Sequence, residues 1–272
     1  MNRILILGAS GFIGNVLYRE LRSYFDTYGT FFTNKSYRNN HHLFNFNVET
    51  DELEPLLHQI KPNYVISALR GDFDAQLETH MQLVSYITKK ACSVVFLSSA
   101  NVFDAFVNYP SYEYDKTLSE SIYGKLKIKI DNSLLKLPET KYIIARLPMV
   151  FGYNSPRIKE LRKALEIRQP YEVFPNLVMN TTCVDKLARQ IHYLINQKRR
   201  GIFHLGSKDL THHDEFIKEI ISELHIEKPS LKNVYTSNSD RYLAVLPKDN
   251  LLPEHLHVTN DEVIHNSCKA IL

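Results

Sequence analysis

The sequence predicts an α/β fold in which a parallel sheet carries helices on both faces. Over the first 150 residues, short apolar runs alternate with stretches that have the spacing of amphipathic helices. The apolar runs are hydrophobic on both faces, which is typical of strands in a covered parallel sheet. The first run passes directly into a glycine-rich turn. These observations favour a doubly wound sheet, and 272 residues suffice for it and a smaller lobe.

The predicted elements follow in order along the first half of the chain. Apolar runs predict strands at residues 4–7, 28–33, 43–48, 64–68, 93–98 and 142–147. Helical spacing predicts helices at residues 12–24, 51–59, 76–90 and 114–137. The second of these helices ends before Lys61-Pro62, because a residue that precedes proline avoids the helical conformation.

The pattern changes after Pro148. Helices are expected at 157–169, 184–196 and 214–224, with a proline-punctuated loop up to residue 180, a strand at 201–205 and a loop-rich tail from residue 229. The strand at 201–205 can return to the main sheet. We therefore expect a larger domain at residues 1–152, rejoined by 182–206, and a small lobe formed by 153–181 and 207–272.

Composition and charge argue against several classes of protein. The net charge is +3 and no basic block with interleaved aromatic residues is present, so no nucleic-acid partner is expected. No apolar run approaches the roughly 18 residues of a membrane span, so no membrane association is expected. The three cysteines lie far apart and the twelve histidines form no HExxH motif, which argues against a disulfide framework or a metal site. A cytoplasmic location is expected.

The turn after the first strand has the spacing of a dinucleotide-binding loop, with the sequence GASGFIG. Its first glycine allows a tight turn, its second lets the backbone approach a pyrophosphate, and its third lets the helix pack against the strand. Free N–H groups at the helix N-terminus then face the phosphates. We therefore expect a Rossmann-type NAD(P) site that includes Gly8, Ser10, Gly11, Phe12, Ile13 and Gly14.

The residues after the second predicted strand favour NADP over NAD. Many NAD-binding proteins place an acidic residue there to hold the ribose hydroxyls, but no carboxylate follows Thr33 in this stretch. Lys35 and Arg38 are close by, and cations at this place can hold a 2′-phosphate. NADP is therefore the expected cofactor, with Thr33, Lys35 and Arg38 among its binding residues. NAD is the alternative, in which case the two cations are solvated loop residues.

A serine, a tyrosine and a lysine follow the glycine loop in an order that indicates proton transfer. Tyr123 and Lys127 are four residues apart, so they share one face of a helix. A nearby ammonium favours the phenolate and eases proton exchange at neutral pH. Ser98 and Ser99 end a predicted strand, at the edge where parallel sheets bind ligands, and a hydroxyl there can hydrogen-bond a substrate carbonyl.

Together these motifs resemble the extended short-chain dehydrogenases/reductases, and among them the sugar-nucleotide group that contains dTDP-4-dehydrorhamnose reductase. The matching segments are GASGFIG at 8–14, SSANVF at 98–103, EYD at 113–115, Tyr123 to Lys127, RLPMVFG at 146–152, NTTCVD at 180–185 and GIFHL at 201–205. The resemblance implies a reductase that acts on a keto group of a nucleotide-linked sugar, and a homodimer in common with many members.

The resemblance also implies roles for single residues. Tyr123 would donate or accept the proton, Lys127 would hold the nicotinamide ribose and tune Tyr123, and Ser99 would hold the substrate carbonyl. Further implied cofactor contacts are Asn47 at the adenine, Ala68 and Leu69 after the fourth strand, Ser98 beside Ser99, and Pro148 and Val150 near the nicotinamide.

The chain departs from the family pattern at several places. Asn101 stands where the reductases often carry a tyrosine, His80 where many members have an asparagine, and Arg70 where small residues often follow the fourth strand. In the predicted helix at 157–169, Arg157 and its basic neighbours either meet a substrate diphosphate or form a solvated face.

Two other functions stay open beside the reductase. A sugar-nucleotide epimerase would retain a tightly bound NAD. A dehydratase is disfavoured, because Ala100-Asn101 stands where such enzymes tend to show Asp-Glu. A non-catalytic regulatory subunit would bind NADP without turnover, as some relatives of the rhamnose reductases do.

Overall fold

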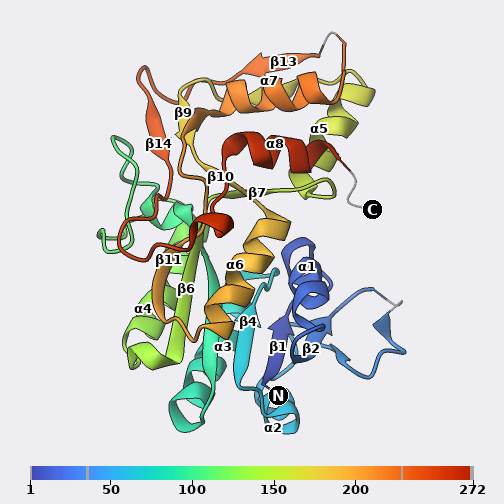
Figure 1. Ribbon diagram of the computed structural model, residues 1–272, viewed down its shortest axis with the longest axis vertical. Helices are drawn as coiled ribbons and strands as arrows, with labels where there is room; N and C mark the ends of the chain where they lie inside the picture. Colours follow the sequence, from blue (N-terminus) through green and yellow to red (C-terminus); the bar gives the residue numbers. More distant parts are fainter. Residues whose placement is uncertain (1, 35–36, 228, 270–272) are drawn as a thin grey trace.

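A seven-stranded parallel sheet forms one lobe of the computed structural model, which describes residues 2–34, 37–227 and 229–269 (Figure 1). The order across the sheet is β11-β6-β5-β4-β1-β2-β3. The strands are β1 (Arg3–Leu7), β2 (Asp26–Phe31), β3 (Leu43–Asn45), β4 (Tyr64–Ser67), β5 (Ser93–Ser99), β6 (Tyr142–Leu147) and β11 (Gly201–His204). This arrangement confirms the predicted doubly wound α/β fold.

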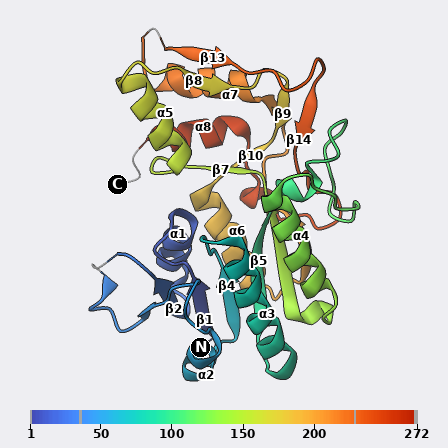
Figure 2. The same cartoon turned by 180° about the vertical axis from the view of Figure 1, so that it is seen from behind.

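Helices cover both faces of this sheet (Figures 1 and 2). One face carries α1 (Phe12–Leu21) and α6 (Val184–Asn196), and the other carries α2 (Glu54–Ile60), α3 (Phe73–Lys89) and α4 (Ile122–Leu135). The central strand β1 shows why its sequence is apolar throughout. Ile4 and Ile6 pack into the core beneath α1 and α6, whereas Leu5 and Leu7 pack into the core on the opposite face.

The sheet order reverses between β1 and β4. From β1 the chain runs outward through β2 and β3, and then returns to β4 and runs the other way through β5 and β6. Helix α1, which follows β1, and helix α3, which follows β4, lie on opposite faces of the sheet, so the connections that leave these two strands diverge at this point. An open crevice at the carboxyl ends of β1 and β4 results, which is where such sheets bind ligands.

The second lobe contains α5 (Pro156–Glu166), α7 (His213–Glu223) and α8 (Asn260–Cys268), which share a core around Phe151 and Phe216. This part of the chain also contains short strands, which form three small sheets separate from the main one. They pair as β7 (Met149–Phe151) with β10 (Thr181–Cys183), β8 (Tyr171–Val173) with β13 (Leu231–Asn233), and β9 (Leu177–Met179) with β12 (Thr211–His212) and β14 (Arg241–Leu243). The 3₁₀ turns include η2 (Ala100–Phe103), η3 (Glu139–Lys141) and η4 (Glu254–Leu256).

The helix predicted at 114–137 is shorter than expected. It starts at Ile122, because the Ser121 side chain caps it by accepting a hydrogen bond from the Gly124 N–H at 3.0 Å. The Asp104 carboxylate holds this start in place by accepting from the Glu120 N–H and the Ser121 hydroxyl, at 2.7 and 2.5 Å. Residues 114–121 therefore form a loop, and that part of the prediction is wrong.

The loop-rich tail predicted from residue 229 also contains β13, β14 and α8. Another prediction for the second half is wrong. The segment before residue 180 contains β8 and β9 rather than loop alone. The three-residue strands give too few positions for an alternating pattern to stand out in the sequence. Among the described residues, no helix is long and apolar enough to cross a bilayer.

Candidate active site

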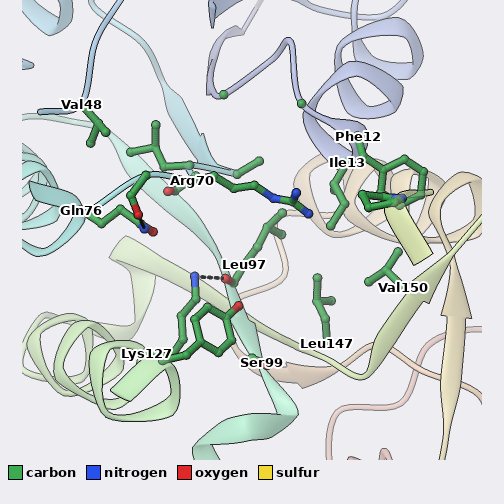
Figure 3. A pocket seen from close by; sticks show the side chains of 18 of the residues that line it. Phe12, Ile13, Val48, Arg70, Gln76, Leu97, Ser99, Lys127, Leu147 and Val150 are labelled. Atoms are coloured by element: carbon green, nitrogen blue, oxygen red, sulfur yellow. Dashed lines mark hydrogen bonds between the residues drawn. The ribbon is translucent and has the colours of Figure 1, made fainter. Parts of the chain in front are cut away.

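A cavity of about 850 Å³ lies at the carboxyl ends of the sheet strands and extends to the second lobe (Figure 3). Glycine-loop, strand-end and α4 residues line it, together with residues of α5 and Leu243 of β14. Most of the sequence-predicted site residues meet here: Gly8, Ser10, Gly11, Phe12, Ile13, Asn47, Ala68, Leu69, Ser98, Ser99, Tyr123, Lys127, Pro148 and Val150.

The residues predicted to select NADP are not part of this lining. Thr33 and Arg38 are exposed and lie outside the cavity wall, and Lys35 falls outside the described residues. The cavity wall at this end contains Phe32 of the segment after β2, and Asn47 and Glu49 of the segment after β3. Gly14 is not part of the cavity lining. It faces the glycine loop instead, where a Cβ would collide with the Gly8 carbonyl oxygen, so glycine at this position lets α1 pack closely on the loop.

The glycine loop presents backbone rather than side chains to the cavity. Gly8 adopts a positive φ of 82°, and a Cβ at this position would lie 2.7 Å from the Ala68 carbonyl oxygen. Gly11 is the N-cap of α1 and supplies no side-chain cap, so the first-turn N–H groups at Phe12 and Ile13 carry no such bond. The loop therefore offers the open helix N-terminus that suits a phosphate.

Two serines end β5 at the floor of the cavity. The Ser99 hydroxyl donates to Asn101 Oδ1 at 3.0 Å and accepts from the Asn101 N–H at 3.2 Å. The Ser98 side chain is buried, and its hydroxyl lowers the pKa of the Asp131 carboxyl. Asn101, one of the departures from the family pattern, thus orients the hydroxyl of Ser99.

Tyr123 lies in the first turn of α4 and retains 39% of its surface exposed. Burial nevertheless raises the pKa of its phenol above the ordinary value. The Ser99 hydroxyl, Arg70 and Arg157 act against this rise and lower the pKa. The sequence-based expectation named Lys127 for this effect, but the groups that lower the phenol pKa here are Ser99 and the two arginines.

Lys127 is buried one turn along α4, and its side chain reaches back to β5. Its Nζ donates to the Leu97 carbonyl oxygen at 3.0 Å and lies 5.5 Å from the centroid of the Tyr123 ring (Figure 3). Burial lowers the pKa of Lys127 to about 8, and the negative charge of Asp131 opposes this shift. The Lys127 ammonium therefore loses its proton at a mildly alkaline pH, close to neutrality.

A buried ion pair lies behind the lysine and was missed in the sequence. Arg146 Nε and Asp131 Oδ2 are 3.3 Å apart, and both side chains are almost fully buried. Arg146 also donates to the Glu113 carbonyl oxygen at 2.7 Å. The signal available in the sequence was spacing, because Tyr123, Lys127 and Asp131 recur every four residues on one helix face.

His80 is buried beside this cluster and is not a free base. A carbonyl oxygen only accepts, so the contact of 2.5 Å with the Gln76 carbonyl places the proton on Nδ1, and Nε2 accepts from Ser67 at 2.8 Å. Burial lowers the pKa of His80 to about 4. His80 therefore stays neutral, and no cluster that could hold a metal ion occurs within the described part of the chain.

The comparison with protein families assigns most of the chain to a known family. The family described as RmlD substrate binding domain matches residues 1–249. This chain belongs to that family. The match covers the whole sheet, the glycine loop and α4, and it ends before α8. The similarity expected from the sequence motifs is confirmed.

Known relatives of this RmlD-family chain are distant. Methionine adenosyltransferase 2 subunit beta of Danio rerio is 22% identical over 232 residues, which span 76% of this chain and 69% of that protein. A dTDP-4-dehydrorhamnose reductase from Bacillus anthracis, solved in complex with NADP, is 20% identical with a TM-score of 0.75 over 97% of this chain and 98% of that one. A dTDP-glucose 4,6-dehydratase from the same organism, in complex with NAD, is 16% identical with a TM-score of 0.80 over 98% and 96%.

Proposed function

We propose that this protein is an NAD(P)-dependent reductase of a keto group on a nucleotide-linked sugar. The observation that carries the proposal is the convergence of the glycine loop, Ser99, Tyr123 and Lys127 on one cavity. Membership of the RmlD family and the similarity to a dTDP-4-dehydrorhamnose reductase support the choice of substrate class.

The residues present fit a dinucleotide. The glycine loop leaves room for a pyrophosphate at the N-terminus of α1. A side chain at Gly8 would collide with the Ala68 carbonyl oxygen, so the loop backbone could not pass this close to the end of β4. Asn47, Ala68, Leu69, Ser98, Pro148 and Val150 would form the rest of the binding wall. When bound, the reduced dinucleotide supplies a hydride. We propose NADP as the preferred form, because no carboxylate ends β2, and Lys35 and Arg38 are the candidates for its 2′-phosphate.

In this proposal, the protein side of the reaction is proton delivery. The Ser99 hydroxyl hydrogen-bonds the substrate carbonyl and favours negative charge on its oxygen. The Tyr123 phenol, protonated because burial raises its pKa, gives its proton to that oxygen. Lys127, whose Nζ lies 5.5 Å from the centroid of the Tyr123 ring, would hold the nicotinamide ribose in its charged form.

Replacement of Tyr123 by phenylalanine tests the proposal. Tyr123→Phe removes only the hydroxyl, so NADPH affinity should persist while turnover of a nucleotide-linked keto sugar falls about 10²–10⁴-fold. Both are measured on the same preparation, by NADPH fluorescence titration and by the loss of NADPH absorbance over a panel of such sugars. Tyr112→Phe, which lies outside the cavity lining, is the matched control and should retain full turnover. Undiminished turnover in Tyr123→Phe would show that the proton comes from elsewhere.

A second candidate is a non-catalytic NADP-binding regulatory subunit. The similarity to a methionine adenosyltransferase subunit favours this alternative. It requires that NADPH binds, that no keto sugar is reduced, and that a partner enzyme copurifies with the chain. An epimerase is distinguished by NAD that stays bound through purification.

We propose that the two domains have different roles. The larger domain, residues 1–152 with 182–206, would bind the cofactor. The smaller lobe, residues 153–181 with 207–272, would select the substrate. The pairing of β11 with β6 supports the first assignment. A reducing cytoplasm is the proposed location, supported by three cysteines that form no disulfide. We also propose a homodimer, because members of the family are often dimers. Analytical ultracentrifugation at several protein concentrations tests this proposal.

A further inference from the structure

Two arginines that the proposed reaction does not use line the cavity, one from each lobe. Arg70 follows β4 in the sheet lobe, and Arg157 lies in the first turn of α5 in the second lobe. The side chain of Arg70 extends into the cavity (Figure 3). Both arginines line the same space as Tyr123, although they are 87 residues apart in the sequence (157 minus 70).

Neither arginine is neutralised within the protein. In the described part of the chain, no ion pair and no side-chain hydrogen bond is formed by Arg70 or by Arg157. Glu160 also lines the cavity, one turn along α5 from Arg157, without forming an ion pair with it. The other arginine of α5, Arg162, behaves differently, because its guanidinium stacks 4.1 Å from the centroid of the Tyr153 ring and is not part of the lining.

The positive charge of both arginines reaches the reaction centre. Arg70 and Arg157 each lower the pKa of the Tyr123 phenol through space. A negative group bound between them would therefore lie beside the carbonyl that Tyr123 protonates. The uncapped N-terminus of α1 is the proposed site of the cofactor pyrophosphate.

We propose that Arg70 and Arg157 form an anion clamp across the cavity, and that the substrate carries a phosphate or carboxylate within a few bonds of the reacting carbonyl. Planar guanidinium groups suit both anions, because each offers paired N–H donors to two oxygens. The clamp rests on the proposed reductase site and narrows its substrates to nucleotide-linked keto sugars whose phosphate or carboxylate lies this close to the reacting carbonyl. Since the two arginines come from different lobes, the anion would also hold the lobes together.

Binding of two stable probes tests the clamp without turnover. dTDP-glucose carries a diphosphate and a neutral sugar, whereas glucuronate carries a sugar carboxylate and no phosphate, so the two distinguish the source of the anion. Each is titrated calorimetrically into the full-length protein, with and without saturating NADPH. The variants are Arg70→Gln, Arg157→Gln and the double variant, with Arg162→Gln as the matched control on the same helix.

The clamp predicts that each single variant weakens binding of at least one probe by about 10–100-fold, which is typical of a lost charged hydrogen bond. The double variant should lose little more than the worse single variant, and Arg162→Gln should bind like the wild type. NADPH affinity should be unchanged throughout.

Three outcomes would overturn the clamp: wild-type protein that binds neither probe, single variants that bind both probes normally, or an Arg70→Gln variant whose only defect is in NADPH affinity. The last would assign Arg70 to the cofactor phosphates. Failure of the proposed reductase looks different. In that case NADPH does not bind or no keto sugar is reduced, while the probes still respond to both arginines.

Discussion

At the scale of single residues, the site depends on how buried charges are compensated. Lys127 has one hydrogen bond, to the Leu97 carbonyl, and its nearest counter-charge is Asp131. Asp131 is itself paired with Arg146. Removing water from a charge is costly unless a partner is present, so the three side chains depend on one another. Loss of the Asp131 charge is therefore expected to alter the pKa of Lys127.

The low pKa of Lys127 predicts an alkaline limit to turnover. Its ammonium is charged below pH 8 and loses its proton as the pH rises through about 8, whereas the Tyr123 phenol stays protonated because its own pKa is raised. In the proposed mechanism, kcat for reduction should therefore fall as the pH rises through about 8. A pH profile of kcat at saturating NADPH and substrate measures this limit.

Asp131→Asn identifies the group responsible for that limit. Loss of the negative charge that raises the Lys127 pKa should move the alkaline limit to lower pH. The same change leaves Arg146 buried without its partner and should cost about 3–5 kcal/mol of unfolding free energy, measured in urea. Asp131→Glu keeps the charge and should keep the limit near the wild-type pH. An unchanged limit in folded Asp131→Asn protein would contradict this account.

The proposed catalytic residues could be found in the sequence, but their partners could not. Tyr123 and Lys127 share a helix turn, and Ser99 ends a strand, so local spacing was enough to predict all three. Arg70 and Arg157 line the same cavity only because the second lobe packs against the sheet lobe. The Asp131–Arg146 pair needs the packing of α4 on β6, which no local pattern encodes.

At the scale of elements, the helix starts show how local signals decide boundaries. The apolar pattern alone extended α4 back to residue 114. The cap at Ser121 sets the real start, and Asp104 supports it from a distant loop. Helix α8 was not predicted, although Thr259 and Glu262, three residues apart, form a capping box that marks its start. Its nine residues were too few for periodicity to stand out.

Removal of this cap predicts a measurable loss of stability. Thr259 accepts from the Glu262 N–H, and the Glu262 carboxylate accepts from the Thr259 N–H. Thr259→Ala should cost about 1 kcal/mol, or roughly 2–4 °C in Tm for a chain of this size. Differential scanning calorimetry measures the shift. Thr88→Ala, at an exposed position inside α3, is the control, and an equal loss there would mean that capping is not the cause.

At the scale of the whole molecule, the chain passes between the lobes several times. It leaves the sheet after β6, returns for α6 and β11, and then leaves again for α7 and α8 (Figure 1). The loop before α4 is also bonded to the tail. The Ser111 N–H donates to the Ala244 carbonyl at 2.9 Å, and the fully buried Glu113 carboxylate accepts from the N–H groups of Lys248 and Asp249.

Glu113→Ala should free the tail from the loop. The Lys248 and Asp249 N–H groups would lose a buried charged acceptor, a contact worth about 1.5–3 kcal/mol. We expect faster trypsin cleavage at Lys248 and a lower thermal stability, both followed on the purified protein. Glu113→Gln retains one carbonyl acceptor and should show a smaller effect. Identical cleavage rates in wild type and Glu113→Ala would show that the carboxylate does not hold the tail.

The bonding of the loop at 104–121 to the tail has a consequence for changing the specificity of this enzyme by design. Arg241 of β14 donates to the Asp104 carbonyl at 3.1 Å, and Asp104 in turn fixes the start of the helix that carries Tyr123. The tail is therefore connected by hydrogen bonds through Asp104 to the start of the helix that carries the proposed proton donor. A tail transplanted alone from a relative with another substrate would displace the helix start, so the transferable module is the tail together with its loop.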